Sequence, residues 1–479
     1  MQESLKTKTA KGFLWGGLTN GLQQLFGLVC GVILGRILSP EDNGIVGLVT
    51  IFSALSAALT ESGFISALSI KKEVSQRDYN AVYWFSIGIG VILYALLYTA
   101  SPLIADFYKI PALCTLARVS FLNFVISSFG IAHSAYLTRN LLIRQRATAT
   151  MVGVIAGGIA AIITALFGLG YWALVVQNLS YVLVSMLGFT YFSAFRPSLH
   201  IDLSPIRSLF RYSSKLVVTN IFIRLNNNFL TSILGKFFPI AMVGQYNQGN
   251  QWNLKGQDFL LSINNSLIQP LMAKIARDDN MRQTQVFQKL LSFVSFITFP
   301  LFFGLALVAH DFIVVLIGEK WMIAADYLRI IAIGGAFAVI SNVFANYALS
   351  QGRSSIYMWN IICFGLLQII LFFVFKGKDL SYLLYAYTAL QILWLNSWYF
   401  ICREQLNYRY RYLFKDVYLY AATATISLLA TAMWTDHVSN IYLRLFSSIL
   451  SMGSLYLLLS FLHSRSIFME IKSFIFKRA

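Results

Sequence analysis

Charged residues are scarce in this sequence. Only 12% of the 479 residues are charged, whereas 57% are hydrophobic, and the mean hydropathy is +0.67. A soluble domain of this length needs roughly a quarter of its residues charged to cover its surface. The apolar residues also gather in runs close to the ~20 residues that cross the hydrocarbon core of a bilayer. These two features exclude a soluble globular protein and predict an all-α integral membrane protein.

Groups that commonly bind metals or carry out catalysis are also few and scattered. The four cysteines lie within or at the ends of apolar runs without metal-ligand spacing, and the five histidines form no ligand cluster. The sequence contains no Walker motif, no H-E-x-x-H and no G-x-S-x-G. We therefore expect no cofactor, no bound metal and no enzymatic activity in this chain.

The net charge of +18 raises the question of nucleic-acid binding. The cations flank apolar runs instead of forming one stripe on a soluble module, so no nucleic-acid partner is expected. Of the 37 lysines and arginines, 26 fall on the side that holds the N-terminus and 9 on the other. Because cytoplasmic loops are enriched in Lys and Arg, this distribution predicts that both termini lie in the cytoplasm.

Apolar runs between charged or turn-rich breaks predict about fourteen transmembrane segments. The first run continues to Leu34 without an A-x-A-like cleavage site, so it is expected to remain as an uncleaved helix. A polar, basic stretch from Phe195 to Lys215 separates the sixth segment from the seventh. The predicted segments are residues 12–35, 44–68, 80–103, 113–136, 147–168, 171–194, 216–238, 240–264, 287–310, 326–349, 356–375, 380–402, 416–434 and 441–462.

The sequence that begins at Leu18 is similar to the sequence that begins 200 residues later, at Val218. The match pairs segment 1 with segment 7 and predicts two parallel six-helix lobes related by a pseudo-two-fold axis. The predicted domains are residues 1–200, residues 201–410, and two additional helices with a cytoplasmic tail in residues 411–479. The aligned identities include Thr19 with Thr219, Asn20 with Asn220, Leu25 with Leu225, Ile33-Leu34-Gly35 with Ile233-Leu234-Gly235, and Gly44 with Gly244.

A short pattern follows segments 1 and 7. Arg36 and Lys236 occupy equivalent positions, and a proline then a glycine come after each of them. This order is typical of a tight turn, here predicted on the extracytoplasmic side. The two cations are expected to anchor the hairpins or contact headgroups rather than bind a ligand.

The first 64 residues contain two blocks, Gly35-Arg36-Ile37-Leu38-Ser39-Pro40 and Glu61-Ser62-Gly63-Phe64, that carry a family resemblance. Together with the surrounding apolar sequence they resemble the opening of the Wzx-type polysaccharide and oligosaccharide flippases of the multidrug/oligosaccharidyl-lipid/polysaccharide (MOP) superfamily. The chain length, the number of segments and the two-lobe repeat extend the resemblance over the whole chain. The resemblance implies alternating access by two lobes and an undecaprenyl-pyrophosphate-linked sugar as cargo.

Polar side chains inside apolar segments are the candidates for function. An ionisable group at membrane depth costs several kcal/mol unless it faces a wet cavity or a partner. Segments 7 and 8 carry polar residues at helical spacing, and segments 1 and 2, their repeat equivalents, add amides and a carboxylate. The predicted substrate-binding residues are Arg224, Lys255, Asn20, Gln24, Asn220, Asn227, Asn228, Gln248 and Gln251, and the candidates for ion coupling are Glu61 and Asp258.

These residue types suit a lipid-linked saccharide. Fixed cations such as Arg224 and Lys255 would attract a pyrophosphate, and amides can satisfy sugar hydroxyls. Other roles remain open: amides in membrane segments often join helices, Lys255 could pair with Asp258, and Glu61 could be solvated at a cytoplasmic helix end.

The sequence therefore favours a flippase that moves a polyprenyl-pyrophosphate-linked oligosaccharide across the bacterial inner membrane. Its cargo would serve lipopolysaccharide O-unit, capsule or exopolysaccharide biosynthesis, and it would work by alternating access around a cationic, amide-rich cavity. The expected partners are the lipid-linked saccharide, membrane lipids, and a polysaccharide polymerase and glycosyltransferases that act before and after it. Two alternatives remain: an ion-coupled multidrug exporter of the same superfamily, and a membrane polysaccharide polymerase or ligase.

Overall fold

The computed structural model describes residues 5–61, 73–275 and 280–463, together with residues 65, 68, 71 and 465. Within these residues every regular element is a helix, which confirms the all-α class predicted from the sequence. Contacts divide the chain into two compact units, Met1–Gly244 and Gln245–Ala479. The predicted lobes, residues 1–200 and 201–410, and the appended residues 411–479 rest on the repeat and remain a prediction.

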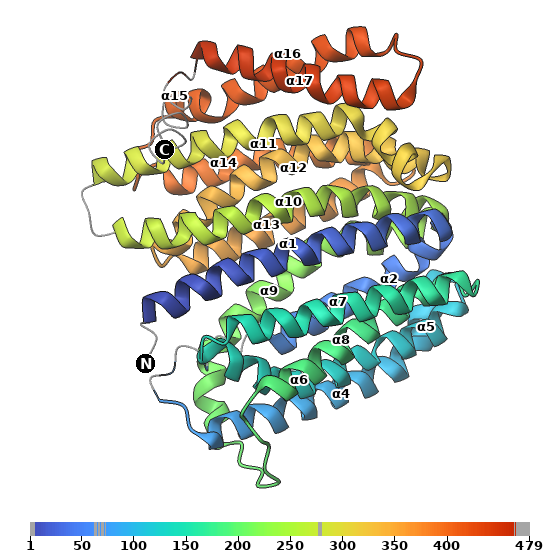
Figure 1. The fold of residues 1–479 in the computed structure, drawn as a ribbon, viewed down its shortest axis with the longest axis vertical. Helices are drawn as coiled ribbons and strands as arrows, with labels where there is room; N and C mark the ends of the chain where they lie inside the picture. Colours follow the sequence, from blue (N-terminus) through green and yellow to red (C-terminus); the bar gives the residue numbers. More distant parts are fainter. Residues whose placement is uncertain are drawn as a thin grey trace. The chain divides into compact units, whose positions relative to one another are not determined.

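The first unit is built from long helices, of which α4, α6, α7 and α8 lie side by side in Figure 1. Helix α5 continues into α6 with a bend at Phe121. The helices are α1 (Leu5–Ile37), α2 (Pro40–Glu61), α4 (Gln76–Tyr108), α5 (Ala112–Ser120), α6 (Leu122–Arg139), α7 (Ile143–Leu166), α8 (Trp172–Phe192) and α9 (Ser204–Phe237).

Helix α10 (Ile240–Ile275) begins in the first unit and continues into the second. In the second unit α12 packs between α11 and α14, and the last two helices form a pair against α11. The elements are α11 (Asn280–Ile317), η1 (Glu319–Trp321), α12 (Met322–Ser350), α13 (Ser354–Phe375), α14 (Leu380–Cys402), α15 (Tyr410–Leu413), the π-helical turn η2 (Phe414–Tyr418), α16 (Leu419–Thr435) and α17 (Ile441–His463).

Each segment predicted to cross the membrane overlaps a helix. Nine helical stretches among the described residues are long and apolar enough to cross a membrane. The chain is therefore a multi-pass membrane protein. Helices α1, α2, α9, α10 and α14 are not among the nine, so the total of fourteen crossings remains a prediction.

The polar stretch predicted at 195–215 is only partly a connector, because α9 already begins at Ser204. Pro205 sits in the first turn, where its missing N–H costs no intrahelical hydrogen bond. The hydropathy of this stretch is too low to predict a membrane segment, which is why the helix start was placed too late.

The connector that remains, residues 193–203, is attached to the first turns of α4. The Asn80 side chain accepts a hydrogen bond from Ser198 N (2.9 Å) and donates one to the carbonyl of His200 (2.6 Å). Arg77 forms an ion pair with Asp202. These contacts join α4 to the start of α9 through the connector.

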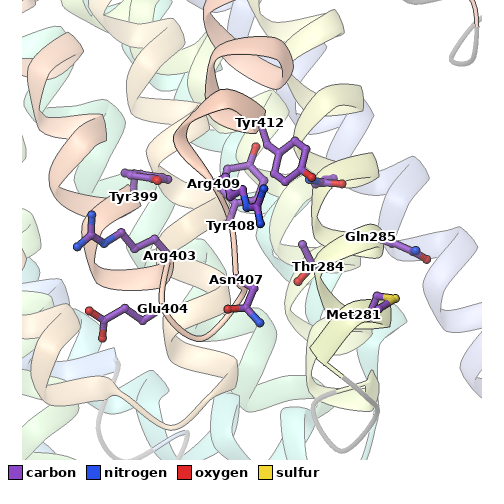
Figure 2. Close-up of a pocket in the computed structure, with 11 residues that line it drawn as sticks. Met281, Thr284, Gln285, Tyr399, Arg403, Glu404, Asn407, Tyr408, Arg409 and Tyr412 are labelled. Atoms are coloured by element: carbon purple, nitrogen blue, oxygen red, sulfur yellow. The ribbon is translucent and has the colours of Figure 1, made fainter.

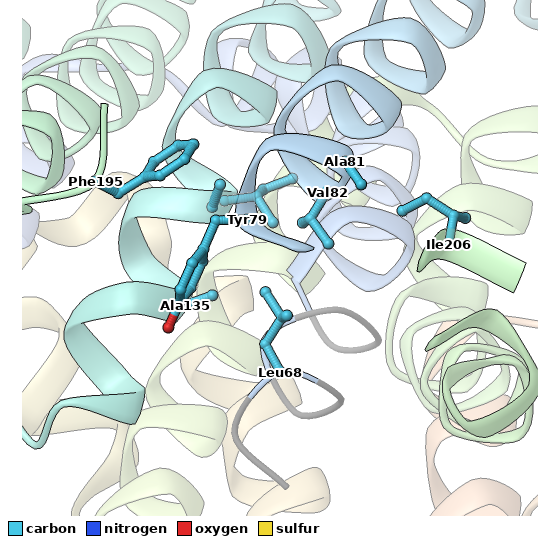
Figure 3. Close-up of a cluster of buried hydrophobic side chains, with 9 residues drawn as sticks. Leu68, Tyr79, Ala81, Val82, Ala135, Phe195 and Ile206 are labelled. Carbon is cyan, nitrogen blue, oxygen red and sulfur yellow. The ribbon is translucent and has the colours of Figure 1, made fainter. Parts of the chain in front are cut away.

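A cluster of buried apolar side chains lies beneath the connector (Figure 3). Phe195, which is 1% exposed, packs on Tyr79 with ring centroids 5.6 Å apart. Val82 and Leu68 are completely buried, and Ile206 brings the first turn of α9 into the same cluster. Burial of these side chains holds the connector on α4 in addition to its hydrogen bonds.

Helices α7 and α8 pack closely because α7 presents a line of small residues to α8. A Cβ atom on Gly153 would lie 2.2 Å from Ser185 Oγ, and one on Gly157 would lie 2.7 Å from the carbonyl oxygen of Gln177. Small residues four apart let two helix backbones approach in a membrane, where dispersion replaces the hydrophobic effect as the driving force. The close approach places the side chains of α8 directly beside α7.

The two tight turns predicted from the sequence are present. α1 ends at Ile37 and α2 begins at Pro40, whereas α9 ends at Phe237 and α10 begins at Ile240. In the first turn Ser39 caps α2: its hydroxyl accepts from Asp42 N (3.2 Å), and the Asp42 carboxylate accepts from Ser39 N (2.9 Å).

The beginnings of α2 and α10 contact each other through equivalent glycines within the first unit. A Cβ atom on Gly44 would lie 2.2 Å from the carbonyl oxygen of Ile240, and one on Gly244 would lie 1.7 Å from that of Pro40. The two glycines are therefore required for the backbones to meet. Gly44 and Gly244 are aligned by the repeat, and each of them contacts the helix that carries the other.

In the second unit α17 is joined to α11 by a partly buried ion pair. Asp311 is 6% exposed and accepts hydrogen bonds from Arg444 at 2.7 Å (Nε) and 2.5 Å (Nη2). Further along, the Tyr456 hydroxyl donates to the carbonyl of Phe296 (3.0 Å). Because Arg444 and Tyr456 of α17 both form hydrogen bonds with α11, the last helices pack as part of the second unit.

Candidate functional site

Three of the predicted site residues cannot be assessed as side chains. Asn20, Glu61 and Asn220 belong to helices α1, α2 and α9, but their side chains lie outside the described part of the structure. Their predicted roles, including ion coupling by Glu61, stay predictions.

Helix α9 carries the predicted cation and two amides in the first unit. Arg224 and Asn227 are exposed, and within the described residues the Arg224 guanidinium has no hydrogen bond or ion pair. Asn228 donates to the carbonyl of Arg224 (2.9 Å), which occupies its amide within the helix. An unpaired cation on a helix that is predicted to cross the membrane is stable where water or an anion reaches it.

The amides of α1 divide between exposure and packing. Gln24 is exposed, as a cavity-lining residue would be. Its neighbour Gln23 donates to Thr150 Oγ1 (2.9 Å) and to the carbonyl of Ala147 (3.3 Å), which joins α1 to α7.

The predicted residues on α10 belong to the second unit. Gln248 is buried, whereas Gln251 and Asp258 are exposed. Lys255 lies over the Trp252 ring, with Nζ 4.6 Å from the ring centroid. A cation–π contact of this kind holds a lysine without neutralising its charge.

An amide near these residues serves only to join helices. Gln245 donates to the carbonyl of Lys320 (2.7 Å) and accepts from the amide of Ala324 (3.0 Å), which ties α10 to the start of α12. The packing role that the sequence left open for such amides therefore applies to Gln245.

A pocket of about 440 Å³ lies within the first unit between α2, α6, α7 and α8. The larger part of its wall is apolar, and the rest carries hydroxyls, amides and one cation. None of the predicted site residues whose side chains are described lines it. Its polar lining residues are Thr50, Asn123, Ser127, Ser134, Arg146, Thr150, Asn178, Tyr181 and Ser185.

Two polar atoms on the pocket wall have no partner among the described residues. They are Asn123 Oδ1 and Ser185 Oγ, on side chains that are 8% and 4% exposed. Buried polar atoms in proteins are nearly always hydrogen-bonded, to protein or to water. These two atoms are therefore available to water or to the hydroxyls of a ligand.

The fixed charge of the pocket is positive. Arg146 lines it at the start of α7 and donates to Thr138 Oγ1 (3.1 Å), which leaves most of its donors available. No Asp or Glu is among the described residues that line the pocket, and the side chain of Glu61, on the same helix as Thr50, lies outside them. An arginine beside amides and hydroxyls can bind a phosphate and neutral sugar groups together.

The pocket residues were missed because serine, threonine and single amides are common in membrane helices. Asn123, Ser127 and Ser134 are four and seven residues apart, and Asn178 and Ser185 are seven apart, so each set falls on one helical face. This spacing was available in the sequence. What the sequence lacked was the evidence that these faces of α6 and α8 come together at one pocket.

Residues 33–326, more than half of the chain, match the family described as polysaccharide biosynthesis protein. The chain belongs to this family. The matched region contains every residue that lines the pocket and all the predicted site residues except Asn20 and Gln24.

Two relatives whose names refer to polysaccharide biosynthesis align with most of the chain. Lipopolysaccharide biosynthesis protein WzxC of Escherichia coli K12 is 27% identical over 359 residues, which are 74% of this chain and 72% of WzxC. Teichuronic acid biosynthesis protein TuaB of Bacillus subtilis 168 is 24% identical over 456 residues, which are 91% of each protein. The resemblance to Wzx-type proteins predicted from the first 64 residues is confirmed.

Solved structures show which fold the family member has. The lipid II flippase MurJ in an inward closed conformation superposes with a TM-score of 0.77 at 14% identity, over 95% of this chain and all of MurJ. An inward-facing multidrug resistance MATE transporter of the MOP superfamily gives 0.65 at 15% identity, over 80% of this chain and 94% of the transporter. The chain therefore has the transporter fold of the MOP superfamily.

Proposed function

We propose that this protein is a flippase that moves a polyprenyl-pyrophosphate-linked oligosaccharide across the bacterial inner membrane during cell-surface polysaccharide biosynthesis. Membership of the polysaccharide biosynthesis family supports the pathway, and the names of WzxC and TuaB agree with it. The fold shared with a lipid II flippase supports the kind of step. In this proposal the chain transports its cargo and performs no covalent chemistry.

The observation that carries the proposal is the chemistry of the pocket in the first unit. Asn123 Oδ1 and Ser185 Oγ have no hydrogen-bond partner among the described residues and would bind sugar hydroxyls, and Arg146 would supply positive charge for a phosphate. Arg224, exposed on α9 in the same unit, is a second cation without a partner among described groups. The cargo's polyprenyl chain would stay in the lipid, since the pocket is too small to enclose it.

The orientation and the cycle are part of the proposal. Both termini would lie in the cytoplasm, and the two predicted lobes would alternate between inward-open and outward-open states around the cargo. Glu61 and Asp258 would couple the movement to an ion gradient, and synthesis enzymes would act before and after it. Arg146, on the predicted cytoplasmic side, would then meet the cargo's pyrophosphate first.

The MATE neighbours keep a multidrug exporter as the second candidate. Such an exporter binds organic cations and would need carboxylates or an aromatic box for them. Among its described lining residues the pocket in the first unit has an arginine and no carboxylate, which favours an anionic or neutral cargo. A polymerase or ligase has no corresponding support in the fold or in the names of the relatives.

The test is mass spectrometry of polyprenyl-linked intermediates in cells with and without the gene. Loss of the flippase should cause a complete, unpolymerised lipid-linked unit to accumulate. Wild-type protein and the control variant Arg144→Gln, which loses the same charge next to the pocket, should clear it. Arg146→Gln should leave it accumulated. An unchanged lipid pool in the deletion strain, with new sensitivity to cationic drugs, would replace the flippase by the exporter.

A further inference from the structure

A second pocket lies wholly within the second unit, where α11 begins and α14 ends. Its volume is about 1020 Å³. Figure 2 shows Arg403 and Glu404 just after the end of α14, Thr284 and Gln285 on α11, and Arg409 at the end of the loop that connects α14 to α15. None of these residues belongs to the proposed translocation site.

The loop that lines this pocket is held firmly in place. Leu406 is completely buried, and its carbonyl accepts a hydrogen bond from the Thr284 hydroxyl of α11. Tyr408, 2% exposed, donates from its hydroxyl to Asp416 Oδ2 (2.7 Å). Asn407 between them has the left-handed backbone conformation (φ 45°) that asparagine tolerates. The loop is therefore a built structure rather than a loose connection.

The partner of Tyr408 is positioned by a rare element. Asp416 lies in the π-helical turn Phe414–Tyr418, is 8% exposed, and also accepts from Ser292 Oγ on α11 (2.9 Å). A π-helical turn is less stable than an α-helical one and occurs frequently at functional sites. Here the π-helical turn directs the Asp416 carboxylate towards Tyr408 and Ser292. The carboxylate therefore holds the loop in place and does not line the pocket.

The cations of the pocket are exposed and available. Arg403 stacks on Phe400, 5.1 Å from the ring centroid, and within the described residues neither its guanidinium nor that of Arg409 has a hydrogen bond or ion pair. Among the described residues that line the pocket, Glu404 is the one acidic side chain. Both guanidinium groups line the same pocket, and a guanidinium group is well suited to bind the oxygens of a phosphate.

The same pocket carries the aromatic residues that mark the membrane surface. Tyr399 and Tyr412 line it on either side of Tyr408, with ring centroids 6.2 and 5.9 Å from that of Tyr408. Tyrosines are enriched at headgroup level because their rings are apolar and their hydroxyls are wet. The pocket also opens at the ends of α11 and α14, whose remaining length is apolar.

We propose that this pocket binds the phosphate group of an anionic membrane lipid. The two arginines would hold the phosphate oxygens, the side-chain amides of Gln285 and Gln288 would face the rest of the headgroup, and the acyl chains would extend along the apolar helices. With both termini in the cytoplasm, the pocket would lie at the cytoplasmic leaflet. This placement rests on the orientation given under the proposed function, whereas the binding itself does not. Phospholipids and the polyprenyl cargo both carry such a phosphate, so the source is settled by experiment.

The experiment uses the full-length protein in nanodiscs that contain phosphatidylglycerol in a phosphatidylcholine background, followed by native mass spectrometry of the retained lipid. The pocket variant is Arg403→Gln with Arg409→Gln. The control is Arg411→Gln with Lys415→Gln, which removes two charges from the same segment at exposed positions that do not line the pocket. Retention by the pocket variant should fall roughly tenfold, since two charge-assisted hydrogen bonds are lost, and the control should match wild type.

Two further arms identify the source of the phosphate. In the first, undecaprenyl pyrophosphate replaces phosphatidylglycerol, and in the second, inorganic pyrophosphate competes with it. Arginine-dependent retention of either lipid supports the pocket and names its ligand. Equal losses in pocket and control variants, or displacement by inorganic pyrophosphate with no lipid retained, would overturn the proposal. Failure of the flippase hypothesis would appear separately, as an unchanged pool of lipid-linked intermediates in the deletion strain.

Discussion

Replacing Gly244 with alanine should destabilise the protein, because no side-chain movement can relieve the contact it creates. The new Cβ would lie 1.7 Å from the carbonyl oxygen of Pro40 and 2.7 Å from its carbonyl carbon. Both are backbone atoms on the facing helix. To reach 3.0 Å, the lower limit for real Cβ contacts, the beginnings of α2 and α10 would have to separate by 1.3 Å.

The size of the effect follows from two opposing terms. Overpacking of a well-packed contact costs about 1–3 kcal/mol, and a backbone obstacle places this case near the upper end. Alanine in a helix gains about 1 kcal/mol over glycine. The net loss in the free energy of unfolding should therefore be about 2 kcal/mol. Gly44→Ala, with its nearest contact at 2.2 Å, should have an effect of the same sign.

Thermal unfolding of purified protein in one detergent measures this directly. Gly453→Ala is the matched control, because a Cβ at that position in α17 meets nothing within 4 Å. It should raise the melting temperature slightly, while Gly244→Ala lowers it. If Gly244→Ala melted at or above wild type, the close crossing of α2 and α10 would not exist in the folded protein.

Three further outcomes are expected. Asp311→Asn should lower stability by about 1.5–3 kcal/mol, because the Arg444 guanidinium loses charged hydrogen bonds, and a double-mutant cycle of thermal unfolding should assign that loss to the pair. A hydrogen bond from Ser204 N and the contact with Arg77 hold the pKa of Asp202 at about 2. Since the pKa of Asp202 is lowered on folding, the attachment of the connector to α4 should persist above about pH 4 and weaken as the pH falls towards 2. Pepsin cleavage within residues 193–203 should therefore increase as the pH falls through that range. The increase should be smaller in Asp202→Asn, which has no carboxylate to protonate. Ser185→Ala should leave the melting temperature unchanged or slightly raised, because its hydroxyl has no partner among described residues, yet should slow clearance of the lipid-linked intermediate; a clear loss of stability would show that the hydroxyl is needed for packing.

The sequence predicted the helices well because the signals for them are local. Hydropathy and proline–glycine turns placed a helix in every predicted segment, and Ser39 with Asp42 marked the start of α2. The early start of α9 at Ser204 was missed because a polar amphipathic stretch has no hydropathy signal, although Pro205 offers a helix-start signal.

The candidate site was predicted less completely, because residue type does not reveal what a side chain faces. Arg224 was found by its charge and is exposed without a partner among the described groups. Gln245 and Gln251 have the same chemistry and lie on one helix, yet the first joins α10 to α12 and the second is exposed. The pocket around Asn123 and Ser185 depends on tertiary packing between helices distant in sequence, which neither periodicity nor composition encodes.

The attachment of the connector to α4 limits where movement can begin. A chain segment held at Asn80, at Arg77 and by the burial of Phe195 has no slack, so the first turn of α9 cannot swing independently of α4. Any change in the direction of α9 must therefore develop along the helix itself, beyond Ile206, or carry α4 with it. The connector therefore couples the two helices, so that α4 and the first turn of α9 move as one rigid body.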